Sequence, residues 1–93
     1  MKVGDIVYFK SIYTARYGKQ GGSYEYHFCP GDRYRIDEIS HVHHHALLQG
    51  HYTKTSGNIT NLEDGSYHFA HSDIWNKLIT VDEWREIQLS KIL

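Results

Sequence analysis

The chain has 93 residues and a formal net charge of −1, from 10 Lys and Arg against 11 Asp and Glu. This length fits one domain, and a domain of this size buries only about 60–65% of the surface that its unfolded chain exposes, so deep pockets are not expected. The balanced charge argues against a general nucleic-acid binder, which usually carries a basic excess, and against an acidic mimic of DNA.

Cysteine content and hydropathy exclude further classes. Cys29 is the only cysteine, so neither an internal disulfide nor a thiolate zinc cage can form, and we expect a small buried or half-buried thiol. The N-terminus lacks the apolar run of a signal peptide, and no stretch is long and apolar enough to span a bilayer. We therefore expect a soluble, cytoplasmic protein.

Two Gly-Asp pairs predict turns that lead into strands. Gly4-Asp5 and Gly31-Asp32 each precede a β-branched and aromatic run, and such runs suit a half-buried pleated sheet. We expect a first strand over residues 3–12 and a later strand over residues 33–40. Between them, residues 14–23 are rich in glycine and basic residues, which predicts a long loop.

The second half predicts shorter elements. Residues 56–58 and 63–65 each place glycine beside Asn or Asp, which predicts two turns. A short strand is expected over residues 66–71 and a single helical turn over residues 72–75. Thr80 and Glu83 have the spacing of a capping box, so a helix is expected from about Val81 to Ile92, lying on the sheet or reaching a partner.

This succession of strands, Gly-rich loop and helical turn resembles an SH3-like barrel. The run Gly31-Asp32-Arg33-Tyr34-Arg35-Ile36 is similar to the Gly-Asp strand common in such barrels. The resemblance implies a mainly β domain of five or six antiparallel strands over residues 1–79, with residues 80–93 as an added C-terminal helix. Recognition of proline-rich peptides is not implied, because paired tryptophans are absent and Ala70-His71-Ser72 stands where such domains carry a proline.

The short chain, its eight tyrosines and its tryptophan-bearing terminal helix also resemble small accessory proteins of bacteriophages. This resemblance implies a viral or mobile-element protein that inhibits or redirects a host factor.

A histidine cluster is the sharpest chemical feature. If its segment is extended, His41, His43 and His45 point to one face of a strand, where imidazoles can bind Zn²⁺, Ni²⁺ or Cu²⁺. If the segment is a loop, the three side chains splay and form an ordinary solvated surface. No carboxylate lies within the cluster, so a second group that orients the ligands is not evident.

Tyrosines around the expected loop form the second feature. Tyr24 and Tyr26 share a strand face, and the others flank a basic segment. Such rings pack a core, form a contact surface for a protein, or stack on bases when basic residues lie beside them. The candidate contact residues are Tyr13, Arg16, Tyr17, Lys19, Tyr24, Tyr26 and, on the helix, Trp84.

No catalytic motif appears, so the sequence predicts a non-enzymatic protein that binds another macromolecule, most naturally a protein. Two alternatives stay open: a metal-binding protein that uses the histidine cluster, and a binder of nucleotides or single-stranded nucleic acid. The oligomeric state is open, as is whether the helix packs in cis or between chains.

Overall fold

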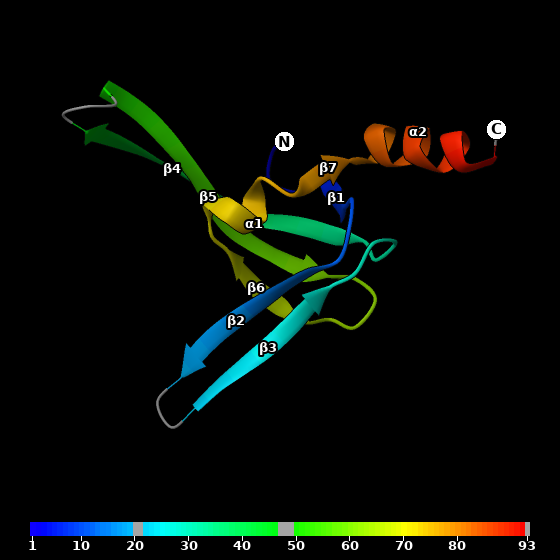
Figure 1. Ribbon diagram of the computed structural model, residues 1–93, viewed down its shortest axis with the longest axis horizontal. Coiled ribbons are helices and arrows are strands. Elements are labelled where there is room, and N and C mark those ends of the chain that lie inside the picture. The colour runs from blue at the N-terminus through cyan, green and yellow to red at the C-terminus, as the bar shows by residue number, and fades with distance from the viewer. Residues whose placement is uncertain (20–21, 47–49, 93) are drawn as a thin grey trace.

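The computed structural model describes residues 1–19, 22–46 and 50–92, and the side chains of these residues other than 19, 44–46, 51 and 52. In this part of the chain, seven strands form two antiparallel sheets. The larger sheet has the strand order β6-β5-β4-β1-β7, and the smaller one is the β2–β3 hairpin (Figure 1). In chain order the elements are β1 (Ile6–Phe9), β2 (Tyr13–Lys19), β3 (Gly22–Phe28), β4 (Tyr34–Ala46), β5 (Gly50–Asn61), β6 (Tyr67–Ala70), α1 (Ser72–Trp75), β7 (Leu78–Thr80) and α2 (Val81–Ile92).

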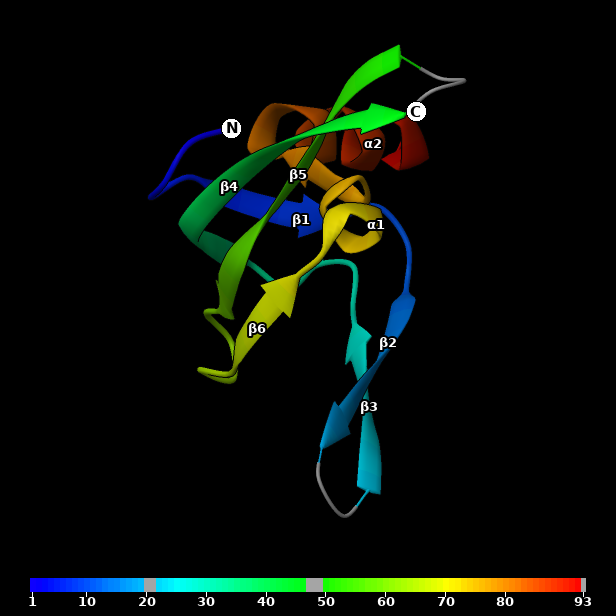
Figure 2. The ribbon, with the colours of Figure 1, turned by 90° about the vertical axis from the view of Figure 1, so that its left-hand side faces the viewer.

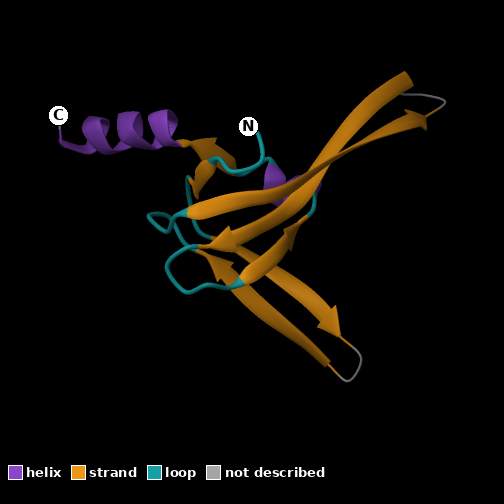
Figure 3. Cartoon of the chain, turned by 180° about the vertical axis from the view of Figure 1, so that it is seen from behind, coloured by secondary structure: helices purple, strands orange, loops and turns teal. Residues whose placement is uncertain are grey.

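The prediction of a mainly β chain with a C-terminal helix is confirmed, but the described strands do not close into a barrel. Strands β2 and β3 pair only with each other in the described ladders. Figure 3 shows the result, in which the hairpin leans against the larger sheet and projects beyond it.

The predicted loop over residues 14–23 is wrong, because most of it belongs to β2 and β3. Gly18 and Gly22 lie toward the tip of the hairpin, and the residues before and after them form cross-strand pairs such as Tyr17 with Tyr24 and Arg16 with Glu25. Pairs of aromatic rings and of opposite charges stabilise such a ladder, and composition alone did not reveal them. The first strand is also shorter than predicted, because Gly4 has a φ of +92° and turns the chain before it begins.

Strand β4 runs past residue 40 to Ala46, so the histidine segment 41–45 is extended. The predicted turn at residues 56–58 is wrong, since Gly57 lies in the middle of β5. Its missing side chain serves close packing: Trp75 and the carbonyl group of Glu38 occupy the space where a Cβ would stand. By contrast, the turn near residues 63–65, the short strand β6, the helical turn α1 and the helix α2 are confirmed.

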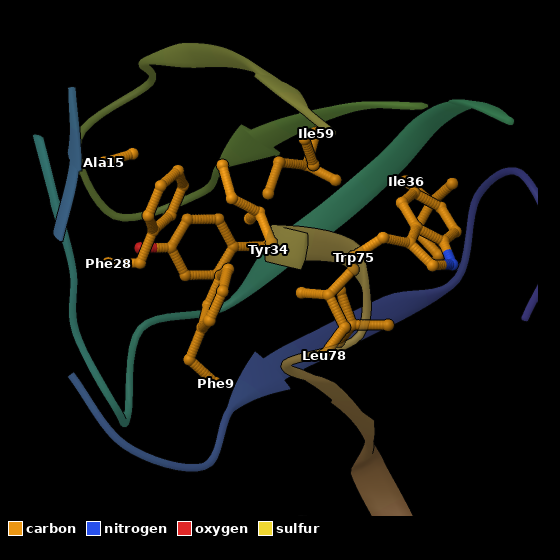
Figure 4. Packing of buried hydrophobic residues seen from close by; sticks show 11 residues of the cluster. Phe9, Ala15, Phe28, Tyr34, Ile36, Ile59, Trp75 and Leu78 are labelled. Atoms are coloured by element: carbon orange, nitrogen blue, oxygen red, sulfur yellow. The ribbon is translucent and has the colours of Figure 1, made fainter. Parts of the chain in front are cut away.

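The core lies between the inner face of the larger sheet and two covering elements, the base of the β2–β3 hairpin and α1. Phe9 and Phe28 stack with ring centroids 4.7 Å apart, and Tyr34 meets Phe9 edge to face (Figure 4). From α1, Ile74 and Trp75 complete the cluster. Side chains alternate between the two faces of β1. Val7 and Phe9 are buried in the core, while Ile6 and Tyr8 are half-buried on the outer face of the sheet.

Helix α2 begins with the predicted capping box. The Glu83 amide donates to Oγ1 of Thr80 at 3.2 Å, and the Thr80 amide donates back to the Glu83 carboxylate at 3.4 Å. These two bonds provide acceptors for backbone N–H groups at the start of the helix, which have no partner within the helix itself. Beyond that turn the helix extends away from the sheet, as Figure 1 shows.

The chain is more extended than its length requires. Its radius of gyration is 15.0 Å, whereas about 12 Å is typical of a compact domain of this length. Three projections account for the difference: the β2–β3 hairpin and the far half of the β4–β5 hairpin (Figure 2), and α2 (Figure 1). A two-stranded ribbon without a core of its own is only marginally stable in water, so these projections call for a functional explanation.

Candidate functional site

The four tyrosines predicted as a contact surface lie on one face of the β2–β3 hairpin. In the ladder, Tyr17 is opposite Tyr24 and Ala15 is opposite Tyr26. Tyr13, Tyr17 and Tyr26 pack against the core, whereas Tyr24 is 43% exposed and stacks on Tyr17. Most of these rings therefore seat the hairpin on the sheet, and Tyr24 is the most exposed of the four.

The opposite face of this hairpin is polar. One guanidinium nitrogen of Arg16 lies 2.9 Å from a carboxylate oxygen of Glu25, so this pair presents no net positive charge to a phosphate. The side chain of Lys19, the other basic residue predicted here, lies outside the described residues. A nucleotide platform on this hairpin stays a prediction.

Hydroxyl groups tie the hairpin to β6 and to the turn before it. Tyr17 donates to the carbonyl oxygen of Phe69 at 3.1 Å, and Tyr26 donates to the Asp64 carboxylate at 3.1 Å. The Tyr26 oxygen in turn accepts from the side-chain amide of Asn61 at 2.9 Å. Burial, followed by the neighbouring tyrosines, raises the pKa of Tyr17 to about 12.

His68 of β6 belongs to this network and is 6% exposed. Its ring centroid lies 3.8 Å from that of Tyr26, and its Nε2 lies 2.7 Å from Oγ of Ser66. Ser66 donates to the Asp64 carboxylate at 2.5 Å, and since a carboxylate only accepts, Nε2 of His68 is the donor to Ser66. These three side chains therefore lack the geometry of a hydrolytic triad, in which the imidazole accepts the proton of serine.

The burial of His68 predicts a dependence of stability on pH. Burial lowers the pKa of this imidazole, against the opposing effect of Asp64. The unfolded chain therefore binds a proton near pH 6.5 while the native state binds it only at lower pH, so the free energy of unfolding falls as the pH falls below about 7. Urea unfolding at several pH values between about 7.5 and 5 measures this slope.

Two variants separate the contribution of His68 to this pH dependence from the contributions of the other histidines. His68→Gln is expected to flatten the slope, while the control His27→Gln, at an exposed position of β3, is expected to keep it. An equally steep slope in His68→Gln and in the parent protein would show that another group carries the dependence.

Trp84, the predicted contact on the helix, serves as the anchor of α2. Its ring stacks on Tyr8 of β1, with centroids 5.1 Å apart and an interplanar angle of 5°. Farther along the helix, Leu89 and Ile92 are 57% and 81% exposed. The ring contact holds the first turn of the helix on the sheet and leaves its far end without apolar cover.

Two aromatic side chains that the sequence did not single out stand on the outer face of the larger sheet. Tyr67 and Phe69 alternate along β6 with the buried His68, and they are 59% and 52% exposed. The ladder places Thr60 opposite Tyr67 and Asn58 opposite Phe69. The alternation of aromatic and other residues along β6 was visible in the sequence, but the alternation alone does not show which face of the strand is buried against the rest of the protein.

Two acidic side chains of β4, those of Asp37 and Glu38, lie on the same face of the sheet as these rings, on the other side of β5. Desolvation raises the pKa of Asp37, but hydrogen bonds from Thr60 and Arg35 outweigh it and hold this pKa below its usual value. Desolvation, followed by the charges of Glu38 and Asp37, raises the pKa of Tyr67. The name aromatic–acidic face is used below for Asp37, Glu38, Tyr67 and Phe69.

The histidine segment lies on the far half of the β4–β5 hairpin. Nδ1 of His41 is 2.9 Å from Oγ1 of Thr55, and Nδ1 of His43 is 2.9 Å from Oγ1 of Thr53. The side chain of His45 lies outside the described residues. Among the described side chains no group of three His, Cys, Asp or Glu is gathered that could hold a metal ion.

An open depression of about 370 Å³ lies beside β1 and the start of α2, lined in part by Met1, Asp5, Thr80 and Asp82. The Asp82 side chain is exposed, whereas Asp5 is half-buried and its carboxylate accepts a hydrogen bond from the Lys2 amide at 3.0 Å. Cys29 is a half-buried free thiol, as expected, and its sulfur lies 3.7 Å from the carbonyl oxygen of His27.

Comparison with protein-family models, with characterised proteins and with solved structures finds no significant match to this chain. Among the described helices, none is long and apolar enough to cross a membrane. Function is therefore inferred from the surfaces described above.

Proposed function

We propose that this protein is a non-enzymatic binding protein, and that its aromatic–acidic face recognises a cationic, partly apolar segment of another protein. The observation that carries the proposal is the exposure of Tyr67 and Phe69 on the sheet face that also carries the carboxylates of Asp37 and Glu38, two strands away. Large exposed rings cost solvation unless a partner covers them, and aromatic residues are enriched in protein interfaces.

The ladder arranges this face in two rows across the sheet. Glu38 is opposite Asn58, which is opposite Phe69. Arg35 is likewise opposite Thr60, which is opposite Tyr67. Each row therefore has an aromatic ring at the edge strand and a charged residue two strands away, about 10 Å across the sheet.

Charge favours a cationic partner. The guanidinium of Arg35 lies 2.8 Å from the carboxylate of Asp37, whereas no ion pair to Glu38 is found among the described residues. One negative charge thus remains on the face, and the Glu38 carboxylate accepts a hydrogen bond from Asn58 at 3.0 Å, which holds it in place. A Lys or Arg side chain of the partner can pass over an aromatic ring of this face on its way to the Glu38 carboxylate. Cation–π attraction to the ring then adds to the ion pair with the carboxylate.

The aromatic–acidic face suits a partner better than the β2–β3 hairpin does. Three of the four hairpin tyrosines pack on the core, and Arg16 is paired with Glu25. We keep Tyr24, Arg16 and Lys19 as a proposed extension of the contact surface. The wider setting that we propose is a viral or mobile-element protein that inhibits or redirects a host factor, built on an opened variant of an SH3-like barrel.

Peptide binding tests this proposal directly. Fluorescent peptides of equal length that combine apolar residues with Lys and Arg are expected to bind, and the same peptides with Glu in place of the basic residues are not. Phe69→Ala is expected to weaken binding about tenfold or more, because a central aromatic contact contributes upward of about 1.4 kcal/mol. Anisotropy titrations at two salt concentrations measure both effects.

Leu89→Ala is the matched control, since Leu89 is also a large exposed apolar side chain but stands on α2, which packs beside β1 and β7 at the other end of the sheet from β6. It should change affinity by less than about twofold, whereas Glu38→Gln should reduce both affinity and its dependence on salt. Equal binding of the basic and acidic peptides, or full binding by Phe69→Ala, would refute the assignment of this face.

A further inference from the structure

We propose that two copies of this chain form a symmetric dimer, in which the projecting halves of their β4–β5 hairpins pair edge to edge through β4. The pairing segment is residues 39–46, and none of its residues belongs to the aromatic–acidic face. This inference goes beyond the protein-binding role proposed above, because it concerns the part of the hairpin that extends away from the body of the protein (Figure 1).

The first observation is a free strand edge. On one side, β4 pairs with β5 along its whole length. On the other side, β1 pairs with it only at Tyr34 and Arg35, and backbone hydrogen bonds of Ile36 end this contact. Among the described strands none pairs with this side of residues 39–46. The backbone N–H and C=O groups that point to this side can therefore accept another strand.

The second observation is the absence of charge along this edge. Residues 39–46 contain no Lys, Arg, Asp or Glu, whereas proteins commonly place charged residues, Lys above all, on exposed edges to prevent pairing with other chains. Other described strands with a free edge carry such residues. Lys54 stands on β5 directly opposite Val42, and β2 and β3 carry Arg16 and Glu25.

The two outermost strands of the larger sheet offer less edge. β6 has only four residues, and the carbonyl oxygen of Phe69 within it already accepts from the Tyr17 hydroxyl. β7 has three residues. Among the described strands, residues 39–46 are therefore the longest uncharged stretch with a free edge.

The symmetry of an antiparallel ladder makes a second copy the fitting partner. A twofold axis perpendicular to the sheet places β4 antiparallel to its own copy, so donors and acceptors of one edge meet those of the other. Directly opposite residues share a face, so the axis passes through a pair of identical residues. We place it at Val42, a β-branched residue near the middle of the segment that is 46% exposed. Its Cβ then lies about 4.5–5.5 Å from that of Val42 of the partner subunit.

This pairing also explains why assembly stops at two copies. The two ribbons together form a four-stranded sheet in the order β5-β4-β4-β5, and added strands stabilise a ribbon that is marginal by itself. The outer strands of the new sheet are the two β5 strands, whose edges carry Lys54, so further copies are not added. A seam of eight residues is only about 26–27 Å long, and such a small interface predicts a weak dimer that depends on concentration.

Analytical ultracentrifugation of the untagged, full chain tests the proposal, over concentrations from about 1 μM to 1 mM. A reversible rise from the mass of the 10.9 kDa chain to twice that mass is expected. Val42→Lys should weaken dimerisation about fivefold or more, because it places two like charges directly opposite each other. The control Val42→Thr keeps a β-branched, uncharged residue and should change it by less than about twofold. Circular dichroism should show both variants folded, since Val42 is exposed.

Cysteine cross-linking locates the seam. Val42→Cys should form a disulfide-linked dimer under mild oxidation, because directly opposite Cβ atoms lie within reach of such a bond. Lys54→Cys is the matched control, since Lys54 is the ladder partner of Val42 but lies on β5. In the dimer it is about 14–15 Å from its copy, across three strand spacings, and should not cross-link. Both variants carry Cys29→Ser, so that the introduced thiol is the only one.

Three results would overturn the proposal: a single, monomeric mass at every concentration, growth beyond two copies, or equal cross-linking of the two cysteine variants. Unchanged dimerisation of Val42→Lys would likewise reject β4 as the seam. Val42→Lys is also expected to bind the basic peptides as tightly as the parent protein does, so a failure of the dimer and a failure of the aromatic–acidic face are separate results.

Discussion

Replacing Gly57 with alanine is expected to lower the free energy of unfolding by about 3 kcal/mol. A Cβ at this position would overlap the carbonyl oxygen of Glu38 and lie 2.8 Å from Cζ3 of Trp75. The carbonyl belongs to the paired strand β4 and the indole to the core, so neither moves without loss of the ladder or of packing. Overpacking of a core costs about 1–3 kcal/mol and occasionally more, and the clash with backbone places this change at the upper end.

Thermal and urea unfolding followed by circular dichroism measures this loss. In a chain of this length 1 kcal/mol corresponds to about 4–8 °C, so the melting temperature should fall by roughly 12–24 °C. Gly18→Ala is the matched control, because Gly18 also lies within a strand but has nothing within 4 Å of the point where a Cβ would stand. It should be neutral or slightly stabilising, and similar losses in both variants would contradict the packing role of Gly57.

The second large effect is expected at Asn61, where Asn61→Ala should cost about 2–4 kcal/mol. This side chain is 1% exposed. Its amide nitrogen lies 2.9 Å from the Tyr26 hydroxyl and 3.3 Å from the Tyr34 hydroxyl, and its oxygen accepts from the Glu63 amide at 2.8 Å. Truncation leaves several buried polar groups short of a partner, and each such group costs about 1–3 kcal/mol.

Asn58→Ala provides the comparison for this prediction, since Asn58 lies on the same strand and its side chain donates to Glu38 near the surface. A loss of about 0.5–1 kcal/mol is expected there. Because Asn61 joins the β2–β3 hairpin to the turn before β6, hydrogen exchange in β2 and β3 should also accelerate in Asn61→Ala. Equal stability of the two variants would mean that solvent replaces the lost partners of the network.

Elements controlled by local chemistry could be predicted well. The Thr80–Glu83 capping box predicted α2 from Val81 to Ile92, and these are its observed ends. The turn near residues 63–65 and the short strand and helical turn after it followed from turn residues and alternation. In each case the interacting groups are within a few residues of one another, so tertiary contacts reinforce a preference that already exists.

Elements that depend on distant partners were predicted poorly. The glycines of residues 14–23 suggested a loop, because the pairing of Tyr17 with Tyr24 is a property of two segments rather than of one. Gly57 suggested a turn because a glycine that admits Trp75 looks the same in sequence as one that bends the chain. The histidine segment was left open between loop and strand, and the ladder with β5 decided it.

For the candidate binding surfaces, too, some features follow from the local sequence and others only from tertiary contacts. The sequence by itself determined a small, mainly β chain with a capped C-terminal helix, an excess of tyrosine and a run of histidines, because composition, alternation and capping act over a few residues. Only the tertiary structure decided that most hairpin tyrosines face the core while Tyr67 and Phe69 face solvent, and that position 45 pairs with position 51. An alternating strand specifies two faces, but which of them is buried depends on the elements that pack against it, and those elements lie far away in the chain.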